Sequence, residues 1–370
     1  MKVLILSCHT GEGHNRAAAA IQREMEAQNI ACEIRDPVGF QSDRAKKLVA
    51  DLYNNMIRTT PKSFGKIYHL GKWYSDKKFP SPVYYANARY AEALHEYIRE
   101  QKIDAVVCTH IYGMEAMTAI ANRYGDRVPS FGVMTDYTVI PFMKDVRMDG
   151  YFIPHESLRS QLSVCMAPES SVFVTGIPVD TRFSSPVSMA EARKELNLPQ
   201  DKKIVMIMTG GVGCGDPKVL CENFLQTADD RFCACFLAGR NEKLRQTVEE
   251  KYGAGGKIRA VGFTDQVNIY MKASDVLITK AGGLSSTEAA AANIPLVHMY
   301  PIPGCETENA RLFMENGMSY WAKDPEEAVR EACRLAVDTE AAEQMREAQR
   351  RQINPMAARD IVQKVMEYVG

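Results

Sequence analysis

Short apolar runs alternate with stretches of helical periodicity from one end of the chain to the other. They predict six strands in each half, at Val3–Leu6, Ala31–Ile34, Ala105–Cys108, Ser130–Met134, Gly150–Ile153 and Val172–Val174, then Ile204–Met208, Phe232–Leu237, Ile258–Val261, Val276–Ile278, Leu296–Met299 and Ser319–Trp321. Several runs are apolar throughout, which is typical of strands covered on both faces. Since alternating strands and helices form parallel sheets, we expect an α/β fold with two doubly wound, Rossmann-like domains.

The break between the domains is predicted in the turn-rich stretch 175–188, where helical signals are weak. We expect residues 1–180 to form the N-terminal domain and residues 186–350 the C-terminal domain. Pro355 is expected to interrupt or restart a helix. The last segment, 351–370, is predicted to be a helix that packs back on the N-terminal domain.

Composition places the chain among globular proteins. It has 370 residues, of which 46% are hydrophobic and 25% charged, which excludes disordered, collagen-like and disulfide-scaffold proteins. No apolar run approaches the ~20 residues of a membrane span, and the N-terminal run is too short for a signal peptide, so we expect a cytoplasmic protein. The ten cysteines lack the spacing of a zinc site and are expected to be structural.

The net charge of −1 hides a local basic segment. Residues 44–89 contain ten Lys or Arg against two Asp, a net charge of +8, which leaves −9 for the rest of the chain. Eight aromatic residues are interleaved with these charges, a pattern that suits an anionic membrane surface. Nucleic acid is the competing partner, disfavoured by the overall charge, and a solvated insertion is the third interpretation. The predicted membrane contacts are Lys62, Lys66, Lys72, Trp73, Lys77 and Lys78.

Two motifs in the N-terminal half follow predicted strands, where doubly wound sheets bind ligands. The first is the Gly-rich turn 8–16, which opens a helix and contains His14. An imidazole there can act as a general base, or it can only cap the helix. The second is Asp136 at the end of a strand, where it can orient His14 or an acceptor, or form an ordinary turn.

Three further motifs follow strands of the C-terminal half. The loop 209–218 has four glycines, but neither it nor the first turn matches a P-loop or the G-x-G-x-x-G dinucleotide pattern. The run 278–289 is the most specific, because paired glycines lead into a Ser/Thr-rich helix start that can hold a pyrophosphate. Glu288 can accept hydrogen bonds from ribose hydroxyls. In the run 301–310, Glu306 and Asn309 can bind sugar hydroxyls or form a helix cap.

Together these motifs resemble the lipid-directed inverting glycosyltransferases of the GT-B fold, namely the monogalactosyldiacylglycerol synthases and the bacterial processive diacylglycerol glucosyltransferases. The resemblance covers nearly the whole chain and rests on the segments Gly11–His14, Thr135-Asp136, 175–179, 210–215, Lys280–Ala289 and Pro303–Ala310. It implies two facing domains, a UDP-hexose donor, a lipid acceptor such as diacylglycerol, no cofactor and no metal. It also implies association with the inner face of the cell membrane.

The resemblance assigns roles to individual residues. His14 and Asp136 are implied to be catalytic, with His14 as the general base, and Gly13 and Tyr137 to contact the acceptor. The implied donor-binding residues are Gly211, Gly213, Phe263, Gly282, Gly283, Ser286, Thr287, Glu288, Glu306 and Asn309. Relatives commonly have Gln where this chain has Cys305, which leaves the donor sugar open. A UDP-sugar 2-epimerase of the same architecture and a non-catalytic nucleotide-sugar-binding module are the alternative functions.

Overall fold

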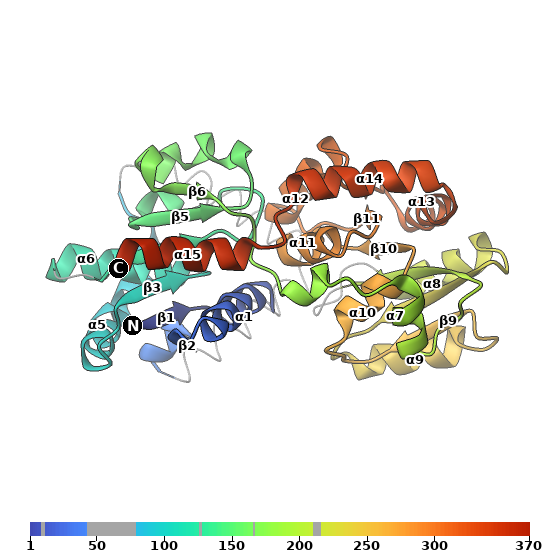
Figure 1. The fold of residues 1–370 in the computed structure, drawn as a ribbon, viewed down its shortest axis with the longest axis horizontal. Helices are drawn as coiled ribbons and strands as arrows, with labels where there is room; N and C mark the ends of the chain where they lie inside the picture. The colour runs from blue at the N-terminus through green and yellow to red at the C-terminus, as the bar shows by residue number, and fades with distance from the viewer. Residues whose placement is uncertain (9–11, 43–78, 126–127, 166, 210–215) are drawn as a thin grey trace. The chain divides into compact units, whose positions relative to one another are not determined.

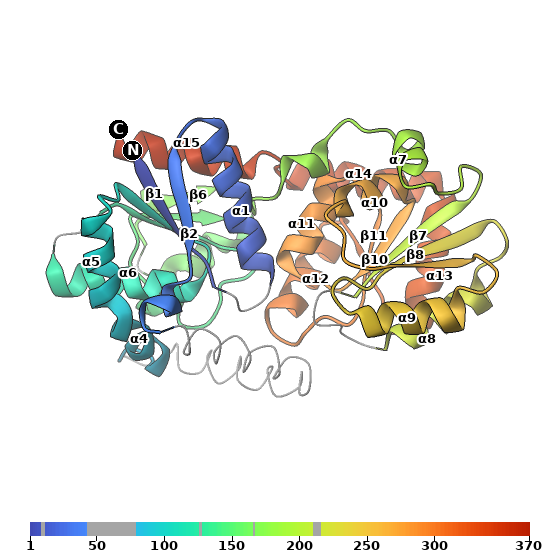
Figure 2. The same ribbon diagram turned by 90° about the horizontal axis from the view of Figure 1, so that it is seen from below.

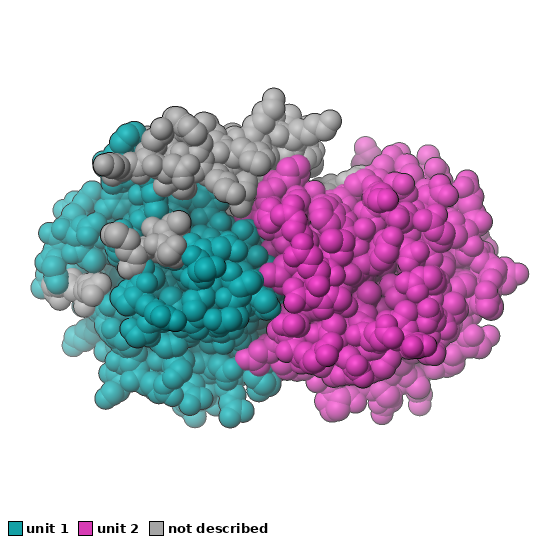
Figure 3. Space-filling view, turned by 90° about the horizontal axis from the view of Figure 1, so that it is seen from above, with its two compact units in different colours: residues 1–180, 356–370 teal, residues 181–355 magenta. Residues whose placement is uncertain are grey.

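The computed structural model describes residues 1–8, 12–42, 79–125, 128–165, 167–209 and 216–370 (Figures 1 and 2). The chain divides into two compact units, coloured separately in Figure 3. Unit 1 comprises Met1–Asp180 and Met356–Gly370, and unit 2 comprises Thr181–Pro355. Each unit contains a six-stranded parallel sheet flanked by helices, so the predicted doubly wound α/β class is confirmed.

The sheet of unit 1 has the strand order β2-β1-β3-β4-β5-β6. Its strands are β1 (Lys2–Leu6), β2 (Ala31–Arg35), β3 (Ala105–Cys108), β4 (Ser130–Val133), β5 (Gly150–Ile153) and β6 (Val172–Val174). The chain runs from β1 to β2 on one side and returns to β3 on the other, so the strand order reverses between β1 and β3. Ligands of doubly wound sheets bind at such a reversal, outside the carboxyl ends of the strands.

The helices of unit 1 cover both faces of this sheet. Among the described residues the α-helices are α1 (Glu12–Ala27), α4 (Pro82–Asn87), α5 (Ala91–Glu100), α6 (Ile111–Tyr124) and α15 (Ala357–Val369). Helix α15 packs against α1, and its Ile361, Val362 and Val365 are buried in one cluster with β1, α1, β3 and β4. The C-terminal helix therefore completes the core of unit 1.

The sheet of unit 2 has the strand order β12-β11-β10-β7-β8-β9. Its strands are β7 (Lys203–Met208), β8 (Phe232–Leu237), β9 (Ile258–Val261), β10 (Val276–Thr279), β11 (Leu296–His298) and β12 (Tyr320–Trp321). The helices are α7 (Met189–Glu195), α8 (Pro217–Thr227), α9 (Glu242–Tyr252), α10 (Val267–Ala273), α11 (Gly283–Ala291), α12 (Cys305–Glu315), α13 (Pro325–Val337) and α14 (Thr339–Gln352). The strand order reverses between β7 and β10.

All twelve predicted strands are confirmed, with ends within one residue. Helical periodicity in the sequence predicts helices at Asn15–Gln28 and Glu115–Arg123. Both helices begin earlier, α1 at Glu12 and α6 at Ile111. The first turn of α1 is polar apart from Gly13, whereas the first turn of α6 is apolar around Gly113 and merges with the apolar signal of the preceding strand. The predicted interruption at Pro355 is confirmed, because α14 ends at Gln352 and α15 begins at Ala357.

Candidate active site

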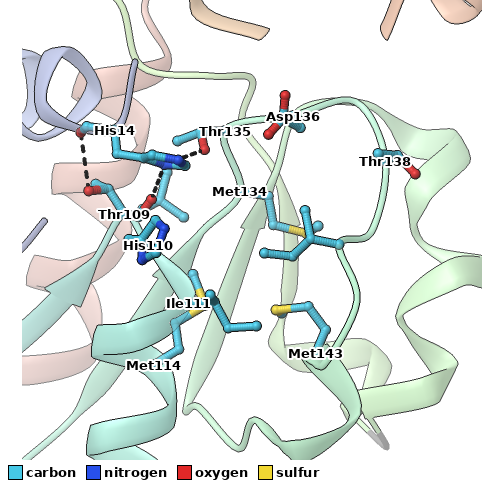
Figure 4. Close-up of a pocket in the computed structure, with 12 residues that line it drawn as sticks. His14, Thr109, His110, Ile111, Met114, Met134, Thr135, Asp136, Thr138 and Met143 are labelled. Carbon is cyan, nitrogen blue, oxygen red and sulfur yellow. Dashed lines mark hydrogen bonds between the residues drawn. The ribbon is translucent and has the colours of Figure 1, made fainter. Parts of the chain in front are cut away.

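His14 lies in the first turn of α1, directly after β1, at the reversal of the unit 1 sheet. Its Nδ1 is 2.9 Å from the carbonyl oxygen of Thr109, which follows β3, and 2.9 Å from the hydroxyl of Thr135, which follows β4 (Figure 4). Thr109 also donates through its hydroxyl to the carbonyl oxygen of His14. Residues that follow two strands therefore fix the position of one imidazole.

These contacts determine which nitrogen of His14 carries the proton. A carbonyl oxygen can only accept a hydrogen bond, so Nδ1 must donate to Thr109. In the neutral ring this leaves the lone pair on Nε2, the arrangement of a histidine that accepts a proton through Nε2. Burial lowers the pKa of His14 to about 4, although the Thr109 carbonyl opposes this shift. His14 is therefore neutral, and able to act as a base, at physiological pH.

A second imidazole lies against the first. The rings of His14 and His110 meet edge to face with their centroids 4.6 Å apart. His110 Nδ1 accepts a hydrogen bond from the backbone N–H of Tyr112 and so caps α6. Burial, and to a lesser degree the neighbouring His14, hold the pKa of His110 well below its usual value. Both rings are therefore neutral and held by backbone groups.

An apolar pocket adjoins these histidines (Figure 4). Its polar side is formed by His14, Thr109, His110, Thr135, Asp136 and Thr138. Its apolar side is formed by Ile111, Met114, Val133, Met134, Ile140 and Met143. A base beside an apolar wall can deprotonate a hydroxyl on a molecule that is itself largely apolar, because the wall excludes competing water.

The other residues predicted in unit 1 occupy different positions around His14. Asp136 lines the pocket next to Thr135, whose hydroxyl contacts the His14 ring (Figure 4). Gly13 lies beside His14 in the first turn of α1 and is partly buried. Tyr137 is only 2% exposed and is not among the pocket residues.

In unit 2, helix α11 begins at the predicted glycine pair. Gly282 is its N-cap and supplies no side chain to the first backbone N–H groups. The hydroxyl of Thr287 donates to the carbonyl oxygen of Gly283 at 2.7 Å, and Ser286 Oγ lies 2.9 Å from Nε2 of the buried His298. Both hydroxyls are thus hydrogen-bonded within the protein. Backbone N–H groups at the start of a helix can also hold an anion.

The other residues predicted to bind the donor sugar nucleotide differ in their exposure, as far as the structure describes them. Glu288 is 3% exposed, and Asn309 is fully buried with its amide donating to the carbonyl oxygen of Ala281 at 3.0 Å. This bond ties α12 to the turn before α11. Phe263 is 65% exposed, and the Arg240 guanidinium lies 4.9 Å from the centre of its ring. The exposed ring is a surface on which a nucleotide base could stack.

Glu306 takes part in an ion pair that the sequence did not predict. The Lys280 ammonium contacts one carboxylate oxygen of Glu306, and the backbone N–H of Ile302 donates to the other at 2.9 Å. Thr109, His110 and Lys280 were all missed as site residues. Each lies within two residues of the end of a strand, so the rule that selected His14 and Asp136 also applies to them.

Several predicted residues lie outside the part of the chain that the structure describes. They are Gly211 and Gly213 of the glycine-rich loop and the membrane contacts Lys62, Lys66, Lys72, Trp73, Lys77 and Lys78. Among the described residues, no group of three or more His, Cys, Asp or Glu side chains could hold a metal ion. Within the same ranges, no helix is long and apolar enough to cross a membrane.

Comparison with known proteins places this geometry in a family. Residues 14–179 match the model described as monogalactosyldiacylglycerol (MGDG) synthase, and residues 188–352 match that of glycosyl transferases group 1. The chain belongs to the glycosyltransferases. The first model begins at His14, and the second covers α11 and α12 with their glycine pair and acidic residues.

Two curated relatives match this glycosyltransferase over most of its length. The processive diacylglycerol beta-glucosyltransferase of Bacillus pumilus is 27% identical over 350 residues, which cover 94% of this chain and 89% of that protein. The protein of the same name from Bacillus subtilis is 26% identical over 349 residues, covering 93% and 89%.

Solved structures show the same fold. The glycosyltransferase aligns with Acinetobacter baumannii MurG at a TM-score of 0.63 and 17% identity, over 99% of both chains. It aligns with the UDP-GlcNAc 2-epimerase of Neisseria meningitidis, solved with UDP-GlcNAc, at a TM-score of 0.63 and 14% identity, over 99% of this chain and 100% of that one. The predicted GT-B fold is confirmed.

Proposed function

We propose that this glycosyltransferase moves a hexose from a UDP-sugar to diacylglycerol with inversion of configuration. The observation that carries the proposal is the His14 geometry, in which Nδ1 is tied to a carbonyl and Nε2 keeps its lone pair beside an apolar pocket. The curated relatives, named as diacylglycerol glucosyltransferases, support the acceptor. The solved structures that carry UDP or UDP-GlcNAc support the donor.

In the proposed reaction the acceptor hydroxyl gives its proton to His14 Nε2 and its oxygen attacks the anomeric carbon of the sugar. The bond from that carbon to the diphosphate oxygen breaks, and its electron pair leaves with UDP. Thr135 already contacts His14, so we propose that Asp136 binds the acceptor in the pocket that both residues line. The backbone N–H groups at the start of α11 stabilise the leaving diphosphate, so no metal ion or other cofactor takes part.

The test is transfer to diacylglycerol followed by mass spectrometry, with a panel of UDP-hexoses and EDTA present. His14→Ala should abolish transfer while UDP still binds, and His155→Asn, at the cap of a surface turn, should retain transfer. Wild-type turnover by His14→Ala would remove His14 from the mechanism. Release of a free sugar from UDP-N-acetylglucosamine without acceptor would indicate an epimerase, and binding without any turnover a non-catalytic module.

We further propose that the protein docks from the cytoplasm on anionic membranes through residues 44–89. Two aromatic side chains at the described end of this segment support the proposal: Phe79 is 54% exposed and Tyr85 is 59% exposed. Aromatic rings favour the membrane interface, and each nearby Lys or Arg adds about 1 kcal/mol on an anionic surface. The protein should sediment with anionic liposomes at low salt and be released at high salt. Failure to sediment at low salt would refute membrane docking.

A further inference from the structure

The ammonium of Lys280 lies over the start of helix α11. An ideal Cβ built on Gly282 would lie only 3.2 Å from Lys280 Nζ and 3.7 Å from Glu306 Oε1. A side chain at position 282 would therefore displace the ammonium. The position of Lys280 thus explains why a glycine occupies this site. Since Gly282 caps the helix without a side chain, the Lys280 ammonium lies close to the first N–H groups of α11.

A second observation points to a ligand at the same place. Thr279 and Lys280 both line a pocket at the carboxyl ends of β7, β10 and β11. Thr279 is 3% exposed, and its hydroxyl has no hydrogen-bond partner among the described residues. A buried hydroxyl without a partner is costly, and a polar ligand in this pocket would remove the cost.

In the ion pair of Lys280 with Glu306, the carboxylate is also held by the backbone. Both side chains are largely buried, 20% exposed for Lys280 and 12% for Glu306. The second oxygen of Glu306 is held by the Ile302 N–H at 2.9 Å, and Asn309 ties the same helix to Ala281. The carboxylate would thus stay in place if the ammonium left. Lysine, with its flexible four-carbon stem, is the partner that can move.

We propose that Lys280 is a catalytic residue whose ammonium exchanges the Glu306 carboxylate for the diphosphate of the donor. In the empty site its ammonium neutralises Glu306. When the donor binds, the ammonium moves to the diphosphate, and Glu306 is released to accept hydrogen bonds from the sugar hydroxyls. The proposal rests on the UDP-sugar donor proposed above.

The exchange links recognition of the sugar to departure of the nucleotide. As the bond between the anomeric carbon and the β-phosphate oxygen breaks, its electron pair remains on that oxygen. The Lys280 ammonium neutralises this added charge, while the anomeric carbon bonds to the acceptor oxygen and the acceptor proton passes to His14. A charged donor aimed at a developing negative charge acts mainly in the transition state, and its removal should lower kcat about 10- to 100-fold.

Calorimetric titration with UDP and with UMP tests the proposal, because only UDP has the β-phosphate. The wild type should prefer UDP, and Lys280→Met should lose about tenfold or more of that preference while UMP binding changes little. Lys280→Arg should restore part of the preference. The matched control is Lys251→Met, which removes the same charge from an exposed position on α9 and should bind like the wild type.

Glu306→Gln separates the exchange from a merely structural ion pair. With no carboxylate competing for Lys280, this variant should bind UDP more tightly than the wild type, while its kcat for hexose transfer falls. If Lys280 only supports Glu306, then Lys280→Met and Glu306→Gln will both lower turnover and leave UDP binding unchanged, which overturns the proposal. Should Lys280→Met fail to fold by circular dichroism, Lys280→Gln replaces it in the same comparison.

The experiment also distinguishes this proposal from the function on which it rests. If the wild type prefers UDP but makes no glycolipid, the proposed acceptor is wrong and the exchange by Lys280 still holds. A wild type that binds neither nucleotide would overturn both. A preference for UDP that persists in Lys280→Met would overturn the exchange alone.

Discussion

Buried His298 should make unit 2 sensitive to acid. It lies on β11 with no exposed surface, between the hydroxyls of Ser286 on α11 and Ser319 before β12, at 2.9 and 3.0 Å. Burial lowers the pKa of His298 to about 3. Protonation in the folded state would place an uncompensated charge beneath the helix that we expect to receive the donor diphosphate.

The size of the effect follows from the two pKa values. Unfolded histidine takes up a proton as the pH falls through about 6.5, whereas folded His298 does so only near 3. The stability that His298 contributes is therefore present above pH 6.5 and is lost as the pH falls toward 3. Between pH 7 and pH 5 this single proton should remove about 2 kcal/mol of the free energy of unfolding.

Urea titrations at pH 7 and pH 5 measure this loss. In a Trp73→Phe background the remaining tryptophan is Trp321, which pairs with His298 in the sheet and reports on unit 2. His298→Gln cannot titrate and should lose about 2 kcal/mol less than its parent over this range, whatever its stability at pH 7. Equal losses in the two proteins would show that folded His298 titrates normally and would refute the argument from burial.

Three further predictions concern unit 1. The low pKa of His14 predicts that kcat/KM for hexose transfer stays level down to about pH 5 and falls near pH 4, and an acid limb near pH 6.5 would contradict this. Burial raises the pKa of Glu115 to about 8, so Glu115→Gln should stabilise the protein by about 1–3 kcal/mol at pH 7 in urea titrations, with the difference closing near pH 4.5. Gly113→Ala would place a Cβ 2.9 Å from the Cβ of Leu6 and should cost about 1–3 kcal/mol, whereas Gly39→Ala meets nothing within 4 Å and should be neutral; equal denaturation midpoints would contradict the packing argument.

Most of the strands were predictable because they are buried on both faces. Runs such as Ala105–Cys108 are apolar and buried at every position. The helix starts were less predictable. The cap of α6 is the ring of His110, and the helix contacts β1 through Gly113, so neither residue carries a hydrophobic signal.

The positions of the site residues were more predictable than their partners. The rule that ligands bind beyond the carboxyl ends of parallel strands selected His14, and it would have selected Thr109 by the same reasoning. The sequence could not show that these two, 95 residues apart, share two hydrogen bonds. That contact depends on the pairing of β1 with β3, which brings their ends together.

The same limit explains why the predicted hydroxyls of α11 face inward. A strand end and a glycine pair indicate where a helix begins, but the direction of each side chain in its first turns depends on what covers the helix. Here the buried His298 engages Ser286, and the carbonyl of Gly283 engages Thr287. The sequence does not show that either of these partners faces the helix. In the proposed diphosphate site the backbone N–H groups of this turn are joined by Lys280, which directly follows β10. The sequence does not show that its ammonium lies beside Gly282, because that position depends on the folded structure.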